Sequence, residues 1–308
     1  MRRPKLKQLS LRNLCIDRLY GRLSQVVVFE CLTVLTLCGC TGSDQFLAEM
    51  GLALLPAQFS LRQIVASVES VACLRHVIRR SPALTALHLS ATSPIADFSF
   101  LVEAIEHQGN KLRSLSLHHT EKESDEFTMD EDLFRTLCWH CRNLRQFGFQ
   151  ISDVNDVELG DTFHTMSEHL PSFRHLPELR TVHLRYPIMV HHYGSSDLPQ
   201  NRTISWHIQK FANAFFQSLD EDGLCPKLNI LIFGTYHDPL DQVDGQVHMP
   251  RHCFVKGYQN DAFGRRIAVA VHTLPYMLRE LDSSMDIIDF DPGCEWVGAR
   301  PGRIYDRS

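Results

Sequence analysis

The sequence predicts an α/β fold: a curved parallel sheet with helices on its convex side, built from irregular repeats of one strand and one helix. The first supporting observation is a template with apolar residues at positions 1, 4 and 6, clearest at Leu112, Leu115 and Leu117. Its last two apolar residues alternate with polar ones, as in a strand that buries one face. Further copies are Leu6/Leu9/Leu11, Leu32/Leu35/Leu37, Leu84/Leu87/Leu89, Leu144/Phe147/Phe149, Leu179/Val182/Leu184 and Leu228/Leu231/Phe233. Such recurrence is typical of a leucine-rich-repeat-like solenoid.

The second observation is the distance between copies of the template. The step from Leu6 to Leu32 is 26 residues and the step from Leu84 to Leu112 is 28 residues, which fits one strand plus one helix. Later steps lengthen to 32, 35 and 49 residues, so we expect inserted loops there. The 52 residues between Leu32 and Leu84 leave room for a degenerate repeat around Leu61-Arg-Gln-Ile64.

The third observation is a helical period in the segments between the strands. Apolar residues at spacings of three and four form stripes over Val71 to Ile78 and over Phe98 to Ile105. Thr128 and Glu131 read as a capping box for a further helix. The clearest helix runs from about Trp206 to Leu219. Each helix is therefore expected to bury its stripe against the back of the sheet.

Two regions interrupt the repeats, and one follows them. Gln150 to Pro177 has only weak periodicity, and Tyr186 to Arg202 is rich in Pro, Gly and Ser, as expected of a long exposed loop. We predict a solenoid over residues 1–236 and a C-terminal capping segment over residues 237–308. Within the cap, Arg266 to Val271 is expected to be a strand, and Ile287, Ile288 and Phe290 a further one.

Composition indicates an intracellular protein that does not bind nucleic acid. The formal net charge is -5, and the basic clusters are short and isolated, whereas a nucleic-acid binder would show a concentrated basic face. The N-terminus has no secretory signal, and the apolar stretch from Val26 to Leu37 is too short to span a bilayer. Ten irregularly spaced cysteines fit reduced thiols. We therefore expect a cytoplasmic or nuclear location and no contact with a membrane.

The residues that flank the inward leucines of each strand are expected to point to the concave face. His88 and His183 fall in one column across this face, and His118 lies in the next column. A polar surface on a rigid sheet suits a protein partner. The predicted partner-binding residues are His88, Ser90, Ser116, His118, Gln150, His183 and Arg185. The alternative is that these are ordinary solvated strand residues.

No metal, cofactor or catalytic site is predicted. Cys138 and Cys141 have the spacing of half a zinc site, but no second pair exists, so core packing on a helix is the better interpretation. Among enzyme signatures, nucleophile-elbow, P-loop, dinucleotide-binding and zincin motifs are missing from the sequence. An unrecognised hydrolase-type enzyme remains an alternative, with loop residues His191, His192, His237 and Asp238 as its candidates. The acidic residues Asp282, Asp286, Asp289, Asp291 and Glu295 are expected to form a solvated face.

A family resemblance appears in the turns that precede several strands. These turns read Arg80-Ser-Pro82-Ala-Leu84, His140-Cys141-Arg-Asn143-Leu144 and Leu224-Cys225-Pro226-Lys-Leu228. They resemble the cysteine-containing leucine-rich repeats of F-box proteins. The C-terminal sequences His252-Cys-Phe-Val-Lys-Gly-Tyr258, Gly264-Arg-Arg-Ile-Ala-Val269 and Asp289-Phe-Asp-Pro292 are similar to the end of filamentous-fungal F-box-type proteins. The resemblance covers most of the chain.

The resemblance implies a non-enzymatic scaffold that corresponds to the substrate-recognition region of an F-box ubiquitin-ligase receptor. Members of that family reach the ligase through a Skp-type adaptor and a cullin, which are therefore possible partners. The F-box module precedes the repeats in that family. We expect it to be missing here, because the first repeat already starts at Leu6. A free-standing repeat protein with no link to ubiquitin is the alternative.

Overall fold

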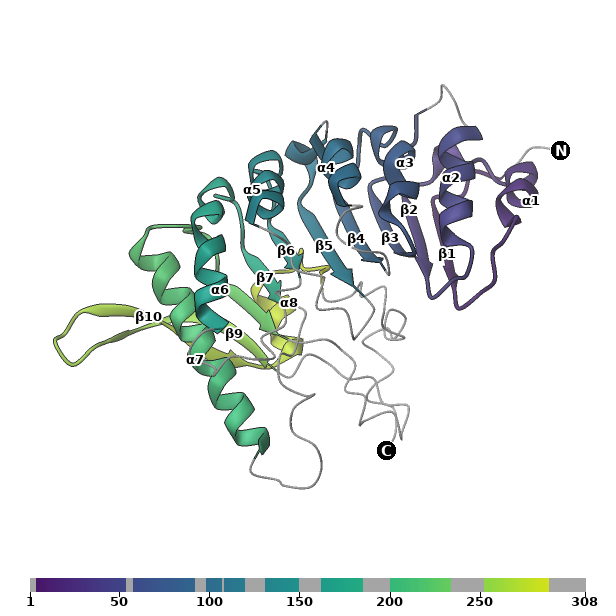
Figure 1. Cartoon of the computed structure of the whole chain (residues 1–308). Helices are drawn as coiled ribbons and strands as arrows, with labels where there is room; N and C mark the ends of the chain where they lie inside the picture. The colour runs from purple at the N-terminus through teal and green to yellow at the C-terminus, as the bar shows by residue number, and fades with distance from the viewer. Residues whose placement is uncertain are drawn as a thin grey trace, which may run out of the picture.

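The computed structural model describes residues 4–53, 58–91, 98–106, 108–119, 131–149, 162–184, 200–233 and 252–287. These residues form an α/β structure with one ten-stranded, mostly parallel mixed sheet that alternates with helices (Figure 1). The strands lie side by side in chain order. They are β1 (Gln8–Arg12), β2 (Val34–Cys38), β3 (Gln63–Val68), β4 (Ala86–Ala91), β5 (Ser114–His119), β6 (Gln146–Phe149), β7 (Thr181–Leu184), β8 (Ile230–Phe233), β9 (His252–Asn260) and β10 (Arg266–Thr273).

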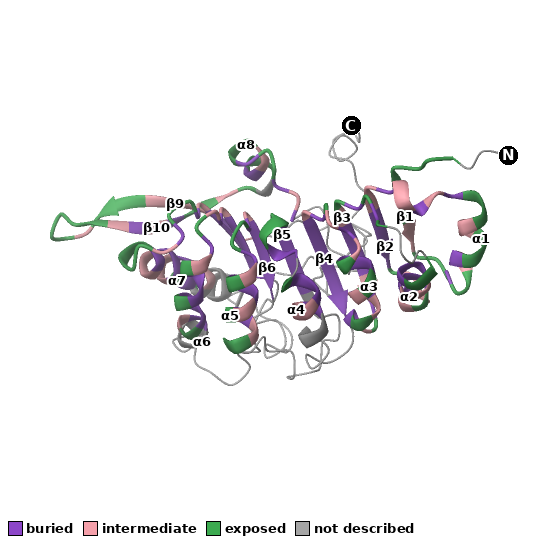
Figure 2. Cartoon of the chain, turned by 90° about the horizontal axis from the view of Figure 1, so that it is seen from above, coloured by how far each residue is buried: buried purple, intermediate pink, exposed green. Residues whose placement is uncertain are grey.

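One helix follows each of the strands β1 to β7, and a last short helix follows β10. They are α1 (Leu19–Val26), α2 (Ser43–Ala53), α3 (Arg75–Arg79), α4 (Phe98–Glu106), α5 (Glu131–His140), α6 (Thr162–His169), α7 (Gln200–Glu221) and α8 (Leu278–Leu281). Short 3₁₀ turns occur at Phe29–Cys31, Val71–Leu74, Gly109–Lys111, Leu170–His175 and Pro275–Met277. Helices α2 to α7 lie on one side of the sheet, whereas α8 lies on the other side (Figure 2).

The template residues of the sequence form continuous rows across the parallel strands. Leu87 pairs in register with Leu115, and Leu115 pairs with Phe147. The row consists of Leu9, Leu35, Ile64, Leu87, Leu115, Phe147, Val182, Leu231 and Phe254. All but Leu9 are at most 1 % exposed and belong to one apolar core. Burying each such side chain contributes about 1.5–3 kcal/mol, so this row is a main source of stability.

The strand expected for the degenerate copy of the template is confirmed as β3. Ile64 occupies the same row as the leucines of neighbouring strands, and Leu61 is fully buried, as the first residue of the template should be. The predicted helices are also present as η2 with α3, as α4, as α5 and as α7. The weakly periodic region before Pro177 contains α6 and a 3₁₀ turn, which its sequence pattern does not reveal. The loop expected over Tyr186 to Arg202 lies outside the described residues as far as position 199. It is wrong at residues 200–202, because α7 already begins at Gln200.

The C-terminal region continues the same sheet with two antiparallel pairings. β9 pairs antiparallel with β8, and β10 pairs antiparallel with β9. The predicted strand from Arg266 to Val271 is thus confirmed as part of β10. Helix α7 holds β10 in place, since Gln209 Nε2 donates to Ala270 O at 2.7 Å and Ala270 N donates to Asn213 Oδ1 at 2.8 Å.

The expected strand around Ile287 is wrong at that residue. Ile287 lies in a turn that follows α8, while residues 288 and 290 lie outside the described part. The physical reason is that the segment containing Ile287 crosses the face of the sheet and does not pair with an edge strand, so the Ile287 side chain is buried against that face.

Among the described helices, none is long and apolar enough to cross a lipid bilayer.

Candidate functional site

The face of the sheet opposite helices α2 to α7 carries small and polar side chains on its middle strands. We define the polar face as His88, Ser114, Ser116, Gln146, Gly148, Thr181 and His183 of β4 to β7. The register places Ser114 beside Gln146, and Ser116 between His88 and Gly148. All seven residues are buried, and of the helices in the described part of the chain, α2 to α7 lie on the opposite side of the sheet.

The polar face is covered in part by a segment of the same chain. We define the C-terminal segment as Asp282–Ile287, which follows α8. The side-chain amide of Gln146 binds the backbone of this segment at three points. Its Nε2 donates to Ser284 O at 2.7 Å, and its Oε1 accepts from Asp286 N at 3.1 Å and from Ile287 N at 2.9 Å. One side chain of β6 therefore satisfies three backbone groups of a segment 138 to 141 residues later in the chain.

The carboxylate of Asp286 is directed at the neighbouring strands. Ser114 Oγ donates to Asp286 Oδ1 at 2.9 Å, and His88 Nε2 lies 4.0 Å from Asp286 Oδ2. Burial raises the pKa of Asp286 to about 6, because the charged form loses water. The hydrogen bond from Ser114 acts in the opposite direction, and the charge of Asp282 adds to the rise.

The side chain of Ile287 fills an apolar pocket beside the polar face. The pocket consists of Ile230, Ile232, Cys253, Leu278 and Met285. Gly148 lies beneath the same side chain. A Cβ at Gly148 would lie 3.0 Å from Ile287 Cδ1 and 3.0 Å from Ser116 Oγ. The lack of a side chain at this position therefore allows the segment to approach the sheet closely.

Ser114, His88 and Asp286 do not have the geometry of a hydrolase triad. In such a triad the serine and the carboxylate contact different nitrogens of the histidine. Here Ser114 Oγ lies 3.5 Å from His88 Nε2, the same nitrogen that faces Asp286, and Ser114 donates directly to that carboxylate. His88 is also 0 % exposed. The contacts of Ser114 are therefore those of a group that binds the Asp286 carboxyl, and they differ from the arrangement of a hydrolase triad.

The exposure expected for several predicted partner-binding residues is wrong. His88, Ser90, Ser116 and His183 are at most 1 % exposed, so none of them is open to a partner in this structure. For His88 and Ser116 the reason is visible, since Asp286 and Ile287 lie over their strands. The expected column is confirmed, because Ser116 and Gly148 link His88 to His183 in register. A role of these residues in partner binding stays a prediction.

The structure says less about the remaining predicted site residues. His118 pairs with Ser90 in the sheet, so it lies in the next column as expected. Gln150 and Arg185 lie outside the described residues, as do the hydrolase candidates His191, His192, His237 and Asp238.

The cysteine pair is confirmed as core. Cys138 and Cys141 are fully buried, and burial raises the pKa of Cys141 to about 12 and that of Cys138 well above its usual value. Thiols held in this way are poor metal ligands, since the thiolate is the form that binds. Within the described part of the chain, no three His, Cys, Asp or Glu side chains come together as a metal site would require.

The expectation of a solvated acidic tail is wrong for two of its residues. Asp282 is 7 % exposed and Asp286 is held by the sheet, while Asp289, Asp291 and Glu295 lie outside the described residues. Sequence reasoning missed this contact because the segment has no repeat pattern. Its partners, Ser114 and Gln146, lie more than 130 residues earlier, and no local signal connects them.

Compared with known proteins, the chain matches no protein-family model, and no curated protein matches it with statistical significance.

Proposed function

We propose that this chain is a leucine-rich-repeat-like solenoid and a non-enzymatic scaffold for protein–protein interaction, similar to the substrate-recognition region of an F-box ubiquitin-ligase receptor. The observation that carries the proposal is the grip of Gln146 on the backbone of the C-terminal segment. A face that already binds a peptide segment through side-chain bonds to its backbone has the chemistry that peptide recognition needs.

The repeat part of the proposal is supported by topology. Eight strands, β1 to β8, run parallel and lie in chain order. Each unit contacts its neighbours and adds one residue to each apolar row, which is how stacked repeats build a continuous core. Helices α2 to α7 lie on one side (Figure 2), and the polar face lies on the other side, where it binds the C-terminal segment.

The C-terminal segment acts in this proposal as an internal occupant of the binding face. It presents a carboxylate to Ser114, backbone groups to Gln146 and an aliphatic side chain to the pocket of Ile230 and Ile232. A protein partner with an acidic residue followed by an aliphatic residue offers the same groups. Such a partner would bind after displacing the segment, with an affinity reduced by the cost of that displacement.

The test compares capture of partners by an open and a closed face. Ile287→Asp would place an unpaired charge in an apolar pocket and should release the segment. We use three tagged full-length chains as bait in fungal extract: the variant, the parent and the control Val271→Asp. The Val271 side chain is 52 % exposed, so this control adds a charge at the surface. We expect specific partners to be enriched on Ile287→Asp alone, and to be lost in the double variant Ile287→Asp/Gln146→Ala.

Two results would change the proposal. Enrichment that is unaffected by Gln146→Ala would remove the polar face as the binding site. Recovery of a Skp-type adaptor and a cullin with the partner would support the link to ubiquitin, whereas recovery of the partner without them would favour the free-standing repeat protein.

A further inference from the structure

A row of cationic side chains follows the edge of the sheet where the parallel strands begin. The second position of the repeat template is Arg or Lys in five of its copies: Lys7, Arg62, Arg113, Arg145 and Arg180. Three of these are consecutive across the sheet. Arg145 N donates to Arg113 O, and Arg180 N donates to Arg145 O, each at 2.8 Å. Neighbouring strands are about 4.8 Å apart, so the three backbones hold like charges close together.

Little negative charge opposes this row. Among the described residues, Arg113 and Arg145 make no ion pair, and Glu178 is the single carboxylate that lines the cavity beside them. Glu178 is already bound by Lys227 Nζ at 2.6 Å and 2.7 Å. This hydrogen bond is the main reason that the pKa of Glu178 is low, and the charges of Arg145 and Arg180 lower it further. The arginine row thus retains uncompensated positive charge.

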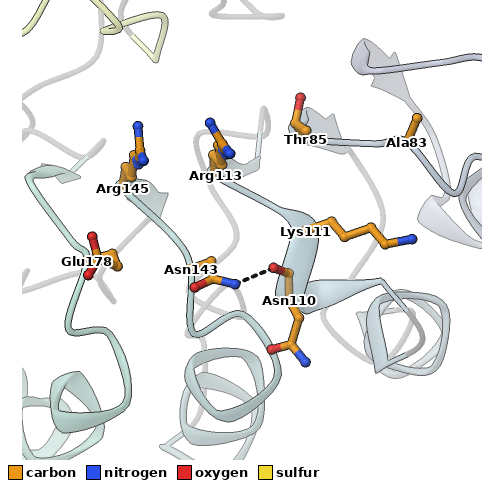
Figure 3. A pocket seen from close by; sticks show the side chains of 8 residues that line it. All are labelled: Ala83, Thr85, Asn110, Lys111, Arg113, Asn143, Arg145 and Glu178. Carbon is orange, nitrogen blue, oxygen red and sulfur yellow. Dashed lines mark hydrogen bonds between the residues drawn. The ribbon is translucent and has the colours of Figure 1, made fainter.

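A cavity of about 500 Å³ opens at this row (Figure 3). It is lined by Ala83, Thr85, Asn110, Lys111, Arg113, Asn143, Arg145 and Glu178. Two of the polar groups are already engaged, since Lys111 Nζ donates to Pro82 O at 2.8 Å and Asn143 Nδ2 donates to Asn110 O at 2.6 Å. The guanidinium groups of Arg113 and Arg145 point to the same side (Figure 3). They are therefore the charged donors of the lining that no described residue binds through a side-chain hydrogen bond or ion pair, and the side-chain amide of Asn110 lies in the same lining.

We propose that Arg113 and Arg145 bind the phosphate group of a phosphorylated ligand in this cavity. The planar guanidinium donates two parallel hydrogen bonds to phosphate oxygens, and two such groups on adjacent strands match a dianion with three terminal oxygens. A carboxylate carries one charge and two oxygens, so it would satisfy only one of the arginines. The phosphate could belong to a small molecule or to a phosphorylated side chain of a protein. The inference does not rest on the protein-binding role of the polar face.

The test uses the full-length chain and two probes, inorganic pyrophosphate and a phosphoserine peptide with Gly and Ser flanks. Binding is measured by calorimetry and by the rise in Tm, for the parent, for Arg113→Gln/Arg145→Gln and for Arg145→Lys. Arg22→Gln, at an exposed position on α1, removes a charge outside the row and serves as control. We expect the double variant to bind at least about tenfold more weakly and Arg145→Lys to be intermediate, because lysine keeps the charge but loses the paired geometry.

The double variant also shows whether a loss of binding reflects unfolding. Removing like charges from one row relieves repulsion, so without ligand its Tm should equal or exceed that of the parent. Preference for pyrophosphate would identify a small phosphorylated ligand, and preference for the phosphopeptide over its unphosphorylated form would identify a modified protein. The proposal is overturned if neither probe binds the parent, or if the double variant binds as tightly as Arg22→Gln.

Discussion

The two faces of the sheet are built by different rules. The face toward the helices is filled by apolar side chains at one recurring position, so Leu87, Leu115 and Phe147 stack in a row that neighbouring strands extend. The opposite face carries Ser114, Gln146 and their polar neighbours, and a distant segment covers it. The first face is defined by a local sequence pattern, and the second by long-range contacts with one segment.

This difference suggests how stability and function are divided. The apolar face cannot open without exposing the core, so its contacts belong to the global unfolding transition. The polar face can lose the C-terminal segment while every parallel strand keeps its neighbours. We therefore expect substitutions on the apolar face to change the stability of the whole molecule, and those on the polar face to change the docking of one segment.

The largest expected effect is a difference in the free energy of unfolding between substitutions at two adjacent residues of β5. Leu115→Ala removes a fully buried side chain from the apolar row, and we expect it to lower the free energy of unfolding by about 2–5 kcal/mol. Ser116→Ala alters the polar face, where the described residues offer Ser116 Oγ no hydrogen-bond partner. It should change stability by less than about 1 kcal/mol, because the buried hydroxyl gains nothing from its position.

Urea denaturation of both variants and the parent measures this contrast. If Leu115→Ala and Ser116→Ala lowered the free energy of unfolding equally, the two faces would contribute equally to stability, and the proposed difference between them would be wrong. Leu115→Asp extends the series, since an unpaired charge in the stacked core should prevent folding altogether.

The same division explains which parts of the structure could be predicted. The strands β1 to β8 follow from the apolar template, and even the degenerate copy at Ile64 was within reach because its spacing fits the repeat. The hairpin partner β9 was missed, since the motif from His252 to Tyr258 contains Lys256 and Gly257 and lacks a clear alternation. This segment forms a strand because it pairs with β8 and β10, and its own sequence pattern does not indicate one.

The candidate site was predictable only in part. Strand alternation placed His88 and His183 in the correct column, because the period of a strand fixes the face of each residue. It could not show that this column is covered. The cover depends on Ile287 fitting above Gly148, and shape complementarity between segments far apart in sequence leaves no local pattern.

An intermediate effect is expected from Gln146→Ala. The variant loses three hydrogen bonds to the C-terminal segment, each worth about 1 kcal/mol. The segment should then open locally, and amide exchange at Asp286 and Ile287 should accelerate by about 10- to 100-fold while the strands keep their protection. Gln63→Ala is the matched control, since Gln63 lies in the same row of the sheet on β3.

Hydrogen exchange followed by mass spectrometry distinguishes the possible outcomes. Faster exchange in β5 and β6 as well as in the segment would show that docking is coupled to the whole fold. Unchanged exchange at the segment would mean that the Ile287 pocket alone holds it, and Gln146 would lose its proposed role in recognition.

The smallest effect concerns pH. The pKa of Asp286 is raised from 3.8 to about 6 in the folded chain, so the docked segment holds this proton more tightly than the free segment does. Docking should therefore be strongest below about pH 4, weaken as the pH rises to 6, and change little above that. The Asp286 side chain is 31 % exposed, so we expect a loss of only about 1 kcal/mol between pH 4.5 and 7.5.

Asp286→Asn should remove this dependence, because the amide stays neutral and its oxygen can still accept from Ser114. The measurement is the protection factor of Asp286 and Ile287, corrected for intrinsic exchange, at both pH values. The parent should lose protection by about fivefold, and the variant should keep it. His88 and Asp282 are the other titratable groups facing this carboxyl. If Asp286→Asn shows the parent's pH profile, one of these groups controls docking, and the carboxylate contact is passive.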